Sequence, residues 1–156
     1  MNILFVCTGN TCRSPMCEGF FRKLIRDAKR TDLQCESAGL SAFPASPASP
    51  NAVEVMKQAG IDLSGHRASG LTAERIEKAD RIIVMTASHK AAILNRCPEA
   101  RSKVFLLGEF ASGPSKGDIA DPFGGNTGVY QECFREMKSA LENLFLDLSN
   151  HKKQSS

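Results

Sequence analysis

Short apolar runs alternate along this chain with longer segments in which apolar residues recur every three or four positions. A short apolar run is typical of a parallel strand that is buried on both faces. Four such runs predict strands: residues 2–6, 33–38, 81–86 and 104–107. The helical spacing predicts helices over residues 15–30, 51–58, 72–78, 88–95 and 129–148. Strands that alternate with helices indicate an α/β fold, a three-layer open sheet of four parallel strands with helices on both faces.

Turn and capping residues support these boundaries. Gly39 stops the second predicted strand, Gly60 stops the second helix, and Thr72 is suited to cap the third. Residues 41–50 hold three prolines and three serines and predict a surface loop, and a polar, glycine-rich stretch covers residues 108–128. A chain of 156 residues with 42% hydrophobic composition is sized for one core. We therefore expect a single domain over residues 1–150, followed by a frayed tail over residues 151–156.

The first strand leads directly into the segment 7–15, Cys-Thr-Gly-Asn-Thr-Cys-Arg-Ser-Pro, and then into the first helix. Cys7 and Arg13 can face one tetrahedral oxyanion, while the backbone N–H groups between them form an anion-binding nest. The pKa of a cysteine falls at a helix N-terminus or beside a cation, and the thiolate is the nucleophile. Arg13 can hold two phosphate oxygens at once, and Ser14 could donate a hydrogen bond to the sulfur. This pattern predicts a phosphate-binding loop that carries its own nucleophile.

Other interpretations of this loop fit the sequence less well. A Walker phosphate loop ends in Gly-Lys-Ser/Thr, which is absent here. The spacing of Cys7 and Cys12 differs from the Cys-x-x-Cys of a redox pair or a zinc site. A cysteine that ends a buried strand is most often an inert apolar residue. The Gly-Asn turn and Arg13 beside it favour the catalytic interpretation.

A phosphatase that works through a cysteine needs an acid to protonate the leaving group and later a base to activate water. Asp121 is the preferred candidate, because it precedes Pro122 and lies in the polar stretch 108–128, which can reach over a pocket. An Asp-Pro pair taken alone is more often a simple turn. Asp118 is the alternative acid.

Composition and charge exclude several classes of function. The net charge of +3 has no long basic block, and the chain has no Trp and one Tyr, so we expect no nucleic-acid partner. No apolar segment is long enough to span a membrane, and the first residues do not resemble a signal peptide. Six cysteines without such a signal suggest reduced thiols, and we expect a cytoplasmic protein with no membrane partner.

The segment 7–15, together with Asp-Pro-Phe-Gly-Gly at 121–125, resembles the low-molecular-weight protein tyrosine phosphatase family. The likeness extends through Glu-Ser-Ala-Gly at 36–39, Gly-Ile-Asp at 60–62, His-Arg-Ala at 66–68 and Met-Thr at 85–86. It implies phosphorylated proteins as substrates, with no cofactor and no metal.

The resemblance also implies a role for each matching residue. Cys7 would form a phosphocysteine, Arg13 would bind the equatorial oxygens, and Asp121 would protonate the leaving group. The rest of the phosphate-binding loop would comprise Thr8, Gly9, Asn10, Thr11, Cys12 and Ser14. Asn10 would fix the loop, Ser14 would assist the thiolate, and His66 would support the loop from behind. Cys12 would be a redox partner that protects Cys7 through a reversible disulfide.

The phosphorylated side chain is predicted from the residues assigned to substrate specificity, Thr11, Phe43 and Phe123. Tyrosine-directed members of the family usually carry Ile or Leu where this chain has Thr11. A polar Thr11 and the two glycines after Phe123 resemble the bacterial protein-arginine phosphatase branch. A hydroxyl can bond a phosphorylated guanidinium, whereas an aliphatic wall favours a phenyl ring. Phosphoarginine is therefore the first choice, and phosphotyrosine remains the alternative.

Two further classes have sequence features that argue against them. An arsenate reductase coupled to thioredoxin needs two more cysteines close together after the third strand, and this chain has only Cys97 there. A phosphopeptide-binding module without activity would lack Cys7 or Asp121, and both are present.

Overall fold

A computed structural model of the chain describes residues 1–112 and 117–155, with side chains for residues 1–112 and 117–150. Its centre is a sheet of four strands, β1 (Asn2–Cys7), β2 (Gln34–Gly39), β3 (Arg81–Val84) and β4 (Val104–Leu106). The strand order is β2-β1-β3-β4, and every neighbouring pair is parallel. The predicted four-stranded parallel sheet is confirmed.

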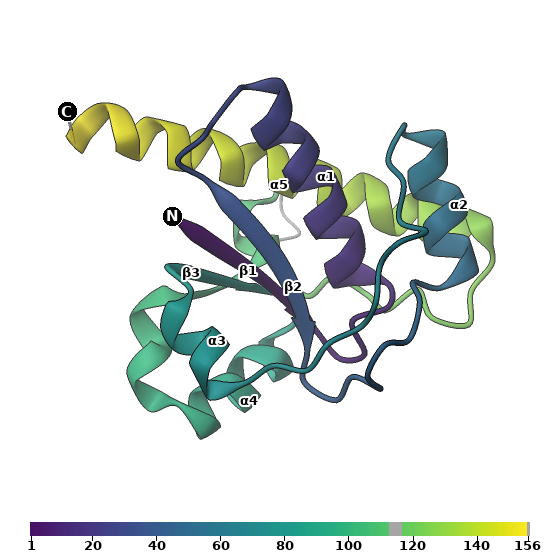
Figure 1. Ribbon diagram of the computed structural model, residues 1–156, viewed down its shortest axis with the longest axis horizontal. Coiled ribbons are helices and arrows are strands. Elements are labelled where there is room, and N and C mark those ends of the chain that lie inside the picture. The colour runs from purple at the N-terminus through teal and green to yellow at the C-terminus, as the bar shows by residue number, and fades with distance from the viewer. Residues whose placement is uncertain (113–116, 156) are drawn as a thin grey trace.

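Alternate residues of β1 face opposite sides of this sheet, and each side is covered by helices (Figure 1). Ile3 and Phe5 pack toward α1 (Arg13–Asp27), α2 (Pro50–Gln58) and α5 (Thr127–Ser155). Leu4 and Val6 pack into the opposite core. That core is covered by α3 (Ala73–Lys78), α4 (Ala87–Arg96) and the 3-10 helix η1 (Pro98–Lys103). The three-layer arrangement is confirmed, and β1 is buried on both faces as its apolar run predicts.

The largest boundary differences lie at the ends of α1 and α5. The first helix begins at Arg13, before Pro15, because N–H groups of the first turn have no partner within the helix and a proline there loses nothing. It ends at Asp27 rather than at residue 30. Lys29 adopts a left-handed conformation with φ of 53°, and the Arg30 N–H bonds to the carbonyl of Ile25 at 3.0 Å.

The last helix, α5, continues to Ser155, past the predicted end at residue 148. The side chains of the expected frayed tail, 151–156, lie outside the described residues. The stretch predicted as a polar loop begins with a second 3-10 helix, η2 (Leu107–Phe110), and its residues 113–116 also lie outside the described part. Neither 3-10 helix was predicted, because such single turns have no apolar period of their own.

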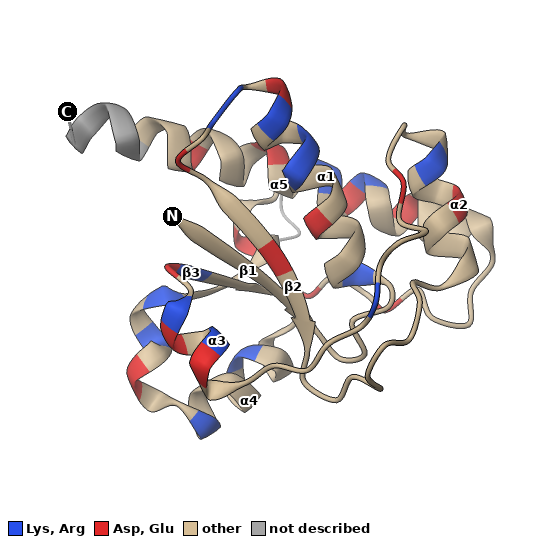
Figure 2. Cartoon of the chain, in the orientation of Figure 1, with Lys and Arg blue, Asp and Glu red and all other residues tan. Residues whose placement is uncertain are grey.

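The central position of β1 decides where a ligand can bind. The chain moves from β1 to β2 on one side and later to β3 on the other, so the carboxyl end of β1 lies at a topological switch point, where open α/β sheets bind ligands. The segment after Cys7 occupies this point. Lys and Arg are interspersed with Asp and Glu along the surrounding helices (Figure 2). No helix of the described residues is long and apolar enough to cross a membrane.

Candidate active site

Cys7 is the last residue of β1 and is 3% exposed. Its Sγ lies 2.9 Å from the Oγ of Ser14, a fully buried residue in the first turn of α1. The loop between them therefore joins the end of a central strand to the start of a helix, and both anchors are part of the core. This arrangement holds the sulfur in one position.

Asn10 organises the loop from its centre. It is fully buried and has φ of 57°, a left-handed conformation that Asn tolerates better than most residues. Its Nδ2 donates to Ser14 Oγ and to Ser37 Oγ, each at 2.9 Å, and its Oδ1 accepts from the Ser69 N–H at 3.0 Å. Three segments far apart in the sequence therefore meet at one side chain.

These bonds also determine the direction of the Ser14 hydroxyl. Because Asn10 Nδ2 donates to Ser14 Oγ, the hydrogen of that hydroxyl is free to be donated onward, and Cys7 Sγ is 2.9 Å away. A hydroxyl that points at the sulfur stabilises a thiolate more than a thiol. The chain of bonds from Asn10 through Ser14 therefore directs a hydrogen-bond donor at the sulfur of Cys7.

Two residues support the loop from behind. His66 Nε2 lies 2.7 Å from the backbone oxygen of Asn10. Gly39, at the end of β2, lies so close that a Cβ atom there would be 2.7 Å from the Thr8 oxygen and 3.0 Å from the Asn10 nitrogen. The loop therefore packs directly against the backbone of the neighbouring strand, and only glycine leaves room for it.

Arg13 lies beside the loop as a nearly buried cation, 4% exposed. Its Nη1 donates to the carbonyl of Ile119 at 2.9 Å, and its Nη2 lies 3.5 Å from Asp121 Oδ2. The Asp121 side chain is 51% exposed, and its Oδ1 accepts from the Phe123 N–H at 3.1 Å. The guanidinium is thus held by the segment that also carries the candidate acid.

Cys7, Arg13 and Asp121 line one cavity of about 220 Å³. The remaining lining residues are Thr8, Gly9, Thr11, Cys12 and Phe123. Asn10 and Ser14 are buried and are not part of this lining. An anion of phosphate size in this cavity would be close to a thiol, a guanidinium and a carboxylate.

The structure separates several of the predicted residues from this cavity. Phe43 is 80% exposed and is not among the lining residues, whereas Phe123 is 75% exposed and does line the cavity. Asp118, the alternative acid, accepts a hydrogen bond from the Ala87 N–H at 2.8 Å, at the start of α4, and does not line the cavity either. Asp121 is therefore the better placed of the two acids.

Cys12 has close polar neighbours that the sequence did not predict. Its Sγ lies 3.2 Å from the Tyr130 hydroxyl and 3.3 Å from Ser49 Oγ. Burial, together with the hydrogen bond to Cys12, raises the pKa of Tyr130 to about 12, so this phenol stays protonated at neutral pH. All six cysteines are free thiols in the structure, including Cys7 and Cys12.

His89 is a residue near the site that sequence analysis missed. It lies in the first turn of α4, is 6% exposed, and its Nε2 lies 2.9 Å from Thr8 Oγ1. Burial, with a smaller contribution from the charge of Arg13, lowers the pKa of His89 below its ordinary value. The sequence could have indicated His89 through its position just after β3, the strand next to β1. Both strands end at the same edge of the sheet, so residues that follow them lie close together.

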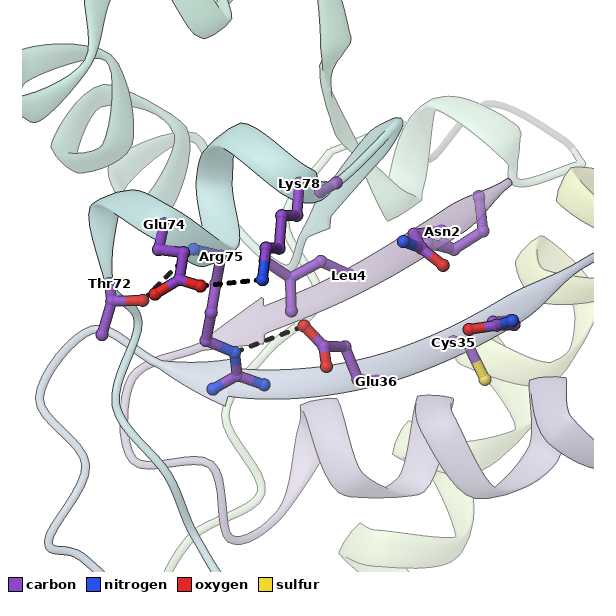
Figure 3. A pocket seen from close by; sticks show the side chains of 11 residues that line it. Asn2, Leu4, Cys35, Glu36, Thr72, Glu74, Arg75 and Lys78 are labelled. Carbon is purple, nitrogen blue, oxygen red and sulfur yellow. Dashed lines mark hydrogen bonds and ion pairs between the residues drawn. The ribbon is translucent and has the colours of Figure 1, made fainter.

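A larger cavity, of about 420 Å³, lies toward the other end of β1 (Figure 3). Its charged side chains pair with one another, Glu74 with Lys78 at 2.7 Å and Arg75 with Glu36 at 3.3 Å. Among residues with described side chains, no group of three or more His, Cys, Asp or Glu could hold a metal ion. Cys35 also lines the larger cavity, but burial raises the pKa of this thiol to about 12. The smaller cavity is therefore the better candidate for an active site.

The fold and this cavity define a class of protein: an α/β protein in which the loop after the first strand carries a cysteine and an arginine that line one cavity. Residues 2–155 match the sequence model of the family described as low molecular weight phosphotyrosine protein phosphatase. The chain belongs to this family of protein phosphatases, which are hydrolases, and the resemblance stated from its motifs is confirmed.

Some individual relatives are named arginine phosphatases, and others are named low molecular weight protein-tyrosine-phosphatases. A protein-arginine phosphatase of Bacillus subtilis is 41% identical over 98% of this chain and 100% of its own length. The YwlE arginine phosphatase of Geobacillus stearothermophilus has a TM-score of 0.89 and 40% identity, covering 99% of this chain and 97% of its own. A further structure is the C7S mutant of a YwlE arginine phosphatase with a phosphorylated active-site serine. It has a TM-score of 0.89 and 40% identity over 96% of each chain.

Proposed function

We propose that this protein hydrolyses phosphoarginine on proteins through a phosphocysteine intermediate on Cys7. One observation carries the proposal: Cys7, whose Sγ is hydrogen-bonded to Ser14, lines the same cavity of about 220 Å³ as Arg13 and Asp121. A related structure with a phosphorylated serine in its active site supports attack on phosphorus by the side chain at the equivalent of the nucleophile.

In the first step, the Cys7 thiolate attacks phosphorus and forms the S–P bond while the P–N bond to the guanidinium breaks. The leaving nitrogen takes its proton from the Asp121 carboxyl group, which becomes a carboxylate. Arg13 and the backbone N–H groups of the loop neutralise the charge that builds up on the three equatorial oxygens. This charge stabilisation comes from the chain itself, so the proposal includes no metal and no cofactor.

In the second step, the Asp121 carboxylate takes a proton from a water molecule, and the water oxygen attacks phosphorus. The S–P bond breaks, inorganic phosphate leaves, and Cys7 returns to the thiolate that the Ser14 hydroxyl stabilises. The Asp121 side chain is half exposed, which allows water to reach it once the first product has left. The acid of the first step is then regenerated.

The choice of phosphoarginine is supported by Thr11 in the cavity wall and by the names of the relatives. The Thr11 hydroxyl can accept a hydrogen bond from a guanidinium N–H, which a phenyl ring does not offer. A polar group that is left without a partner discriminates between substrates more strongly than a small change in apolar contact. Phosphotyrosine is the alternative substrate, and Phe123 at the cavity would contact its ring.

The replacement Cys7→Ser tests the mechanism. We expect turnover of p-nitrophenyl phosphate and of phosphoarginine peptides to be lost, while inorganic phosphate still binds in the cavity. Turnover that is comparable to the wild-type enzyme would exclude Cys7 as the nucleophile. A Cys35→Ser variant is a matched control, because Cys35 lies on β2 and does not line the cavity.

The replacement Thr11→Ile tests the substrate. The ratio of kcat/KM for a phosphoarginine peptide to kcat/KM for a phosphotyrosine peptide of the same sequence should fall by about 10-fold or more. An unchanged ratio would remove Thr11 as the basis of the preference. A wild-type enzyme that prefers phosphotyrosine would establish the alternative substrate.

The compartment is part of the same proposal. All six cysteines are free thiols, which is typical of proteins in a reducing environment. We therefore propose the cytoplasm as the compartment of the enzyme and of its phosphorylated protein substrates.

A further inference from the structure

His89 and Thr8 form a hydrogen-bonded pair between α4 and the phosphate-binding loop. The two residues are 81 positions apart, and Nε2 of the ring lies 2.9 Å from Thr8 Oγ1. The backbone N–H of His89 donates to Thr86 Oγ1, the cap of α4, at 3.1 Å. The imidazole is thus attached to a fixed helix end, whereas Thr8 directly follows Cys7.

The surroundings of the ring indicate which nitrogen carries the proton. Nδ1 is buried and has no hydrogen-bond partner among the described residues. A buried N–H without an acceptor is costly, and the positive charge of Arg13 also disfavours a second proton on this ring. The neutral tautomer with hydrogen on Nε2 avoids both penalties, because that hydrogen has Thr8 Oγ1 as its acceptor.

This tautomer has a consequence for Thr8. When Thr8 Oγ1 accepts the hydrogen bond from His89, its own hydrogen is free to be donated elsewhere. Thr8 is exposed and lines the cavity together with Cys7 and Arg13. The same arrangement occurs at Asn10, which donates a hydrogen bond to Ser14 and so leaves the Ser14 hydroxyl free to donate to the sulfur of Cys7.

We propose that His89 is a positioning residue that turns the Thr8 hydroxyl into a hydrogen-bond donor for a phosphoryl oxygen bound in the cavity. This inference rests on the proposed function, since it assigns the donor to the phosphoryl group that Cys7 attacks. His89 itself does not line the cavity and acts only through Thr8. The bound phosphoryl group would then have the Thr8 hydroxyl as a donor in addition to the Arg13 guanidinium and the backbone N–H groups of the loop.

A double-mutant cycle on the purified enzyme tests the coupling. His89→Leu removes the Nε2 donor, and Thr8→Val removes the hydroxyl; each should lower kcat/KM by about 2- to 10-fold, the value of one hydrogen bond. The double variant should lose no more than Thr8→Val alone, because His89 acts through that hydroxyl. Losses that multiply in the double variant would overturn the proposal.

Two further measurements separate positioning from a merely structural role. His89→Gln, whose amide nitrogen can take the place of Nε2, should recover most of the activity that His89→Leu loses. The inhibition constant of inorganic phosphate should rise in His89→Leu and return in His89→Gln. If the glutamine variant is as impaired as the leucine variant while both remain folded by thermal unfolding, the positioning role is wrong.

The tautomer can be observed without substrate. Nitrogen-15 NMR of the wild-type imidazole at neutral pH should show a protonated Nε2 and an unprotonated Nδ1 for His89. A protonated Nδ1 would overturn the inference even if Cys7→Ser abolishes turnover as expected. Conversely, retained turnover in Cys7→Ser would contradict the proposed mechanism whatever the NMR result, so the two failures are distinguishable.

Discussion

The replacement Asn10→Ala should weaken both the fold and the nucleophile. It removes three hydrogen bonds of a fully buried side chain, those to Ser14, Ser37 and Ser69. Each contributes about 1 kcal/mol, and placing Ala at φ of 57° costs about 1 kcal/mol more. We therefore expect the free energy of unfolding to fall by about 4 kcal/mol.

For a chain of 156 residues, a loss of this size lowers Tm by about 8–16 °C. Activity should fall as well, because without Asn10 the Ser14 hydroxyl can turn away from Cys7 Sγ. A hydrogen bond to a charged group is worth about 1.5–3 kcal/mol, which corresponds to a loss in kcat/KM of about 10- to 100-fold. Urea unfolding and steady-state kinetics on an aryl phosphate measure the two effects.

Two control variants separate the contributions. Asn10→Gly removes the same hydrogen bonds but tolerates the left-handed backbone, so it should be about 1 kcal/mol more stable than Asn10→Ala. Asn143→Ala removes side-chain bonds to Phe110 and Ser112, far along α5, and should lower stability without changing kcat/KM. An Asn10→Ala enzyme that loses less than 1 kcal/mol of stability, or that keeps full activity, would refute this account of the loop.

Three further predictions follow from other parts of the site. Asp121→Asn should slow a phosphoprotein by about 100-fold or more and an activated aryl phosphate much less, since a good leaving group scarcely needs an acid; equal losses on both would count against Asp121. Gly39→Ala should lower Tm and kcat/KM together, because its Cβ would collide with the Thr8 oxygen at 2.7 Å; a variant as stable and active as wild type would show that the loop can shift. The lowered pKa of His89 means that below about pH 6.5 the unfolded chain binds more protons than the native one, so stability falls as pH falls toward 5. Urea unfolding at pH 7 and pH 5 should show a smaller loss in His89→Gln, and an identical loss would place the responsible group elsewhere.

Local sequence was sufficient for the elements and for the loop itself. The apolar run over residues 2–6 predicts a strand buried on both faces, and β1 is such a strand, one residue longer at Cys7. Residues 7–13 contain the proposed nucleophile, the cation and the Gly-Asn turn within seven residues, so the local sequence alone brings these groups together. Helix starts were less certain, as at Pro15, because unpaired N–H groups in a first turn allow several starting points.

The contacts that hold and supplement this loop were decided by the tertiary structure alone. Asn10 bonds to Ser37 and Ser69, and Thr8 meets His89, across separations of 27, 59 and 81 positions. The spacing of apolar residues does not indicate which partner a side chain on β2 or α4 will bond. Such bonds form only when the strand order and register bring two strand ends to the same edge of the sheet. Packing likewise turned Asp118 toward α4 and Asp121 toward Arg13. The sequence could not predict this difference, because both carboxyl groups lie close together in the same polar stretch.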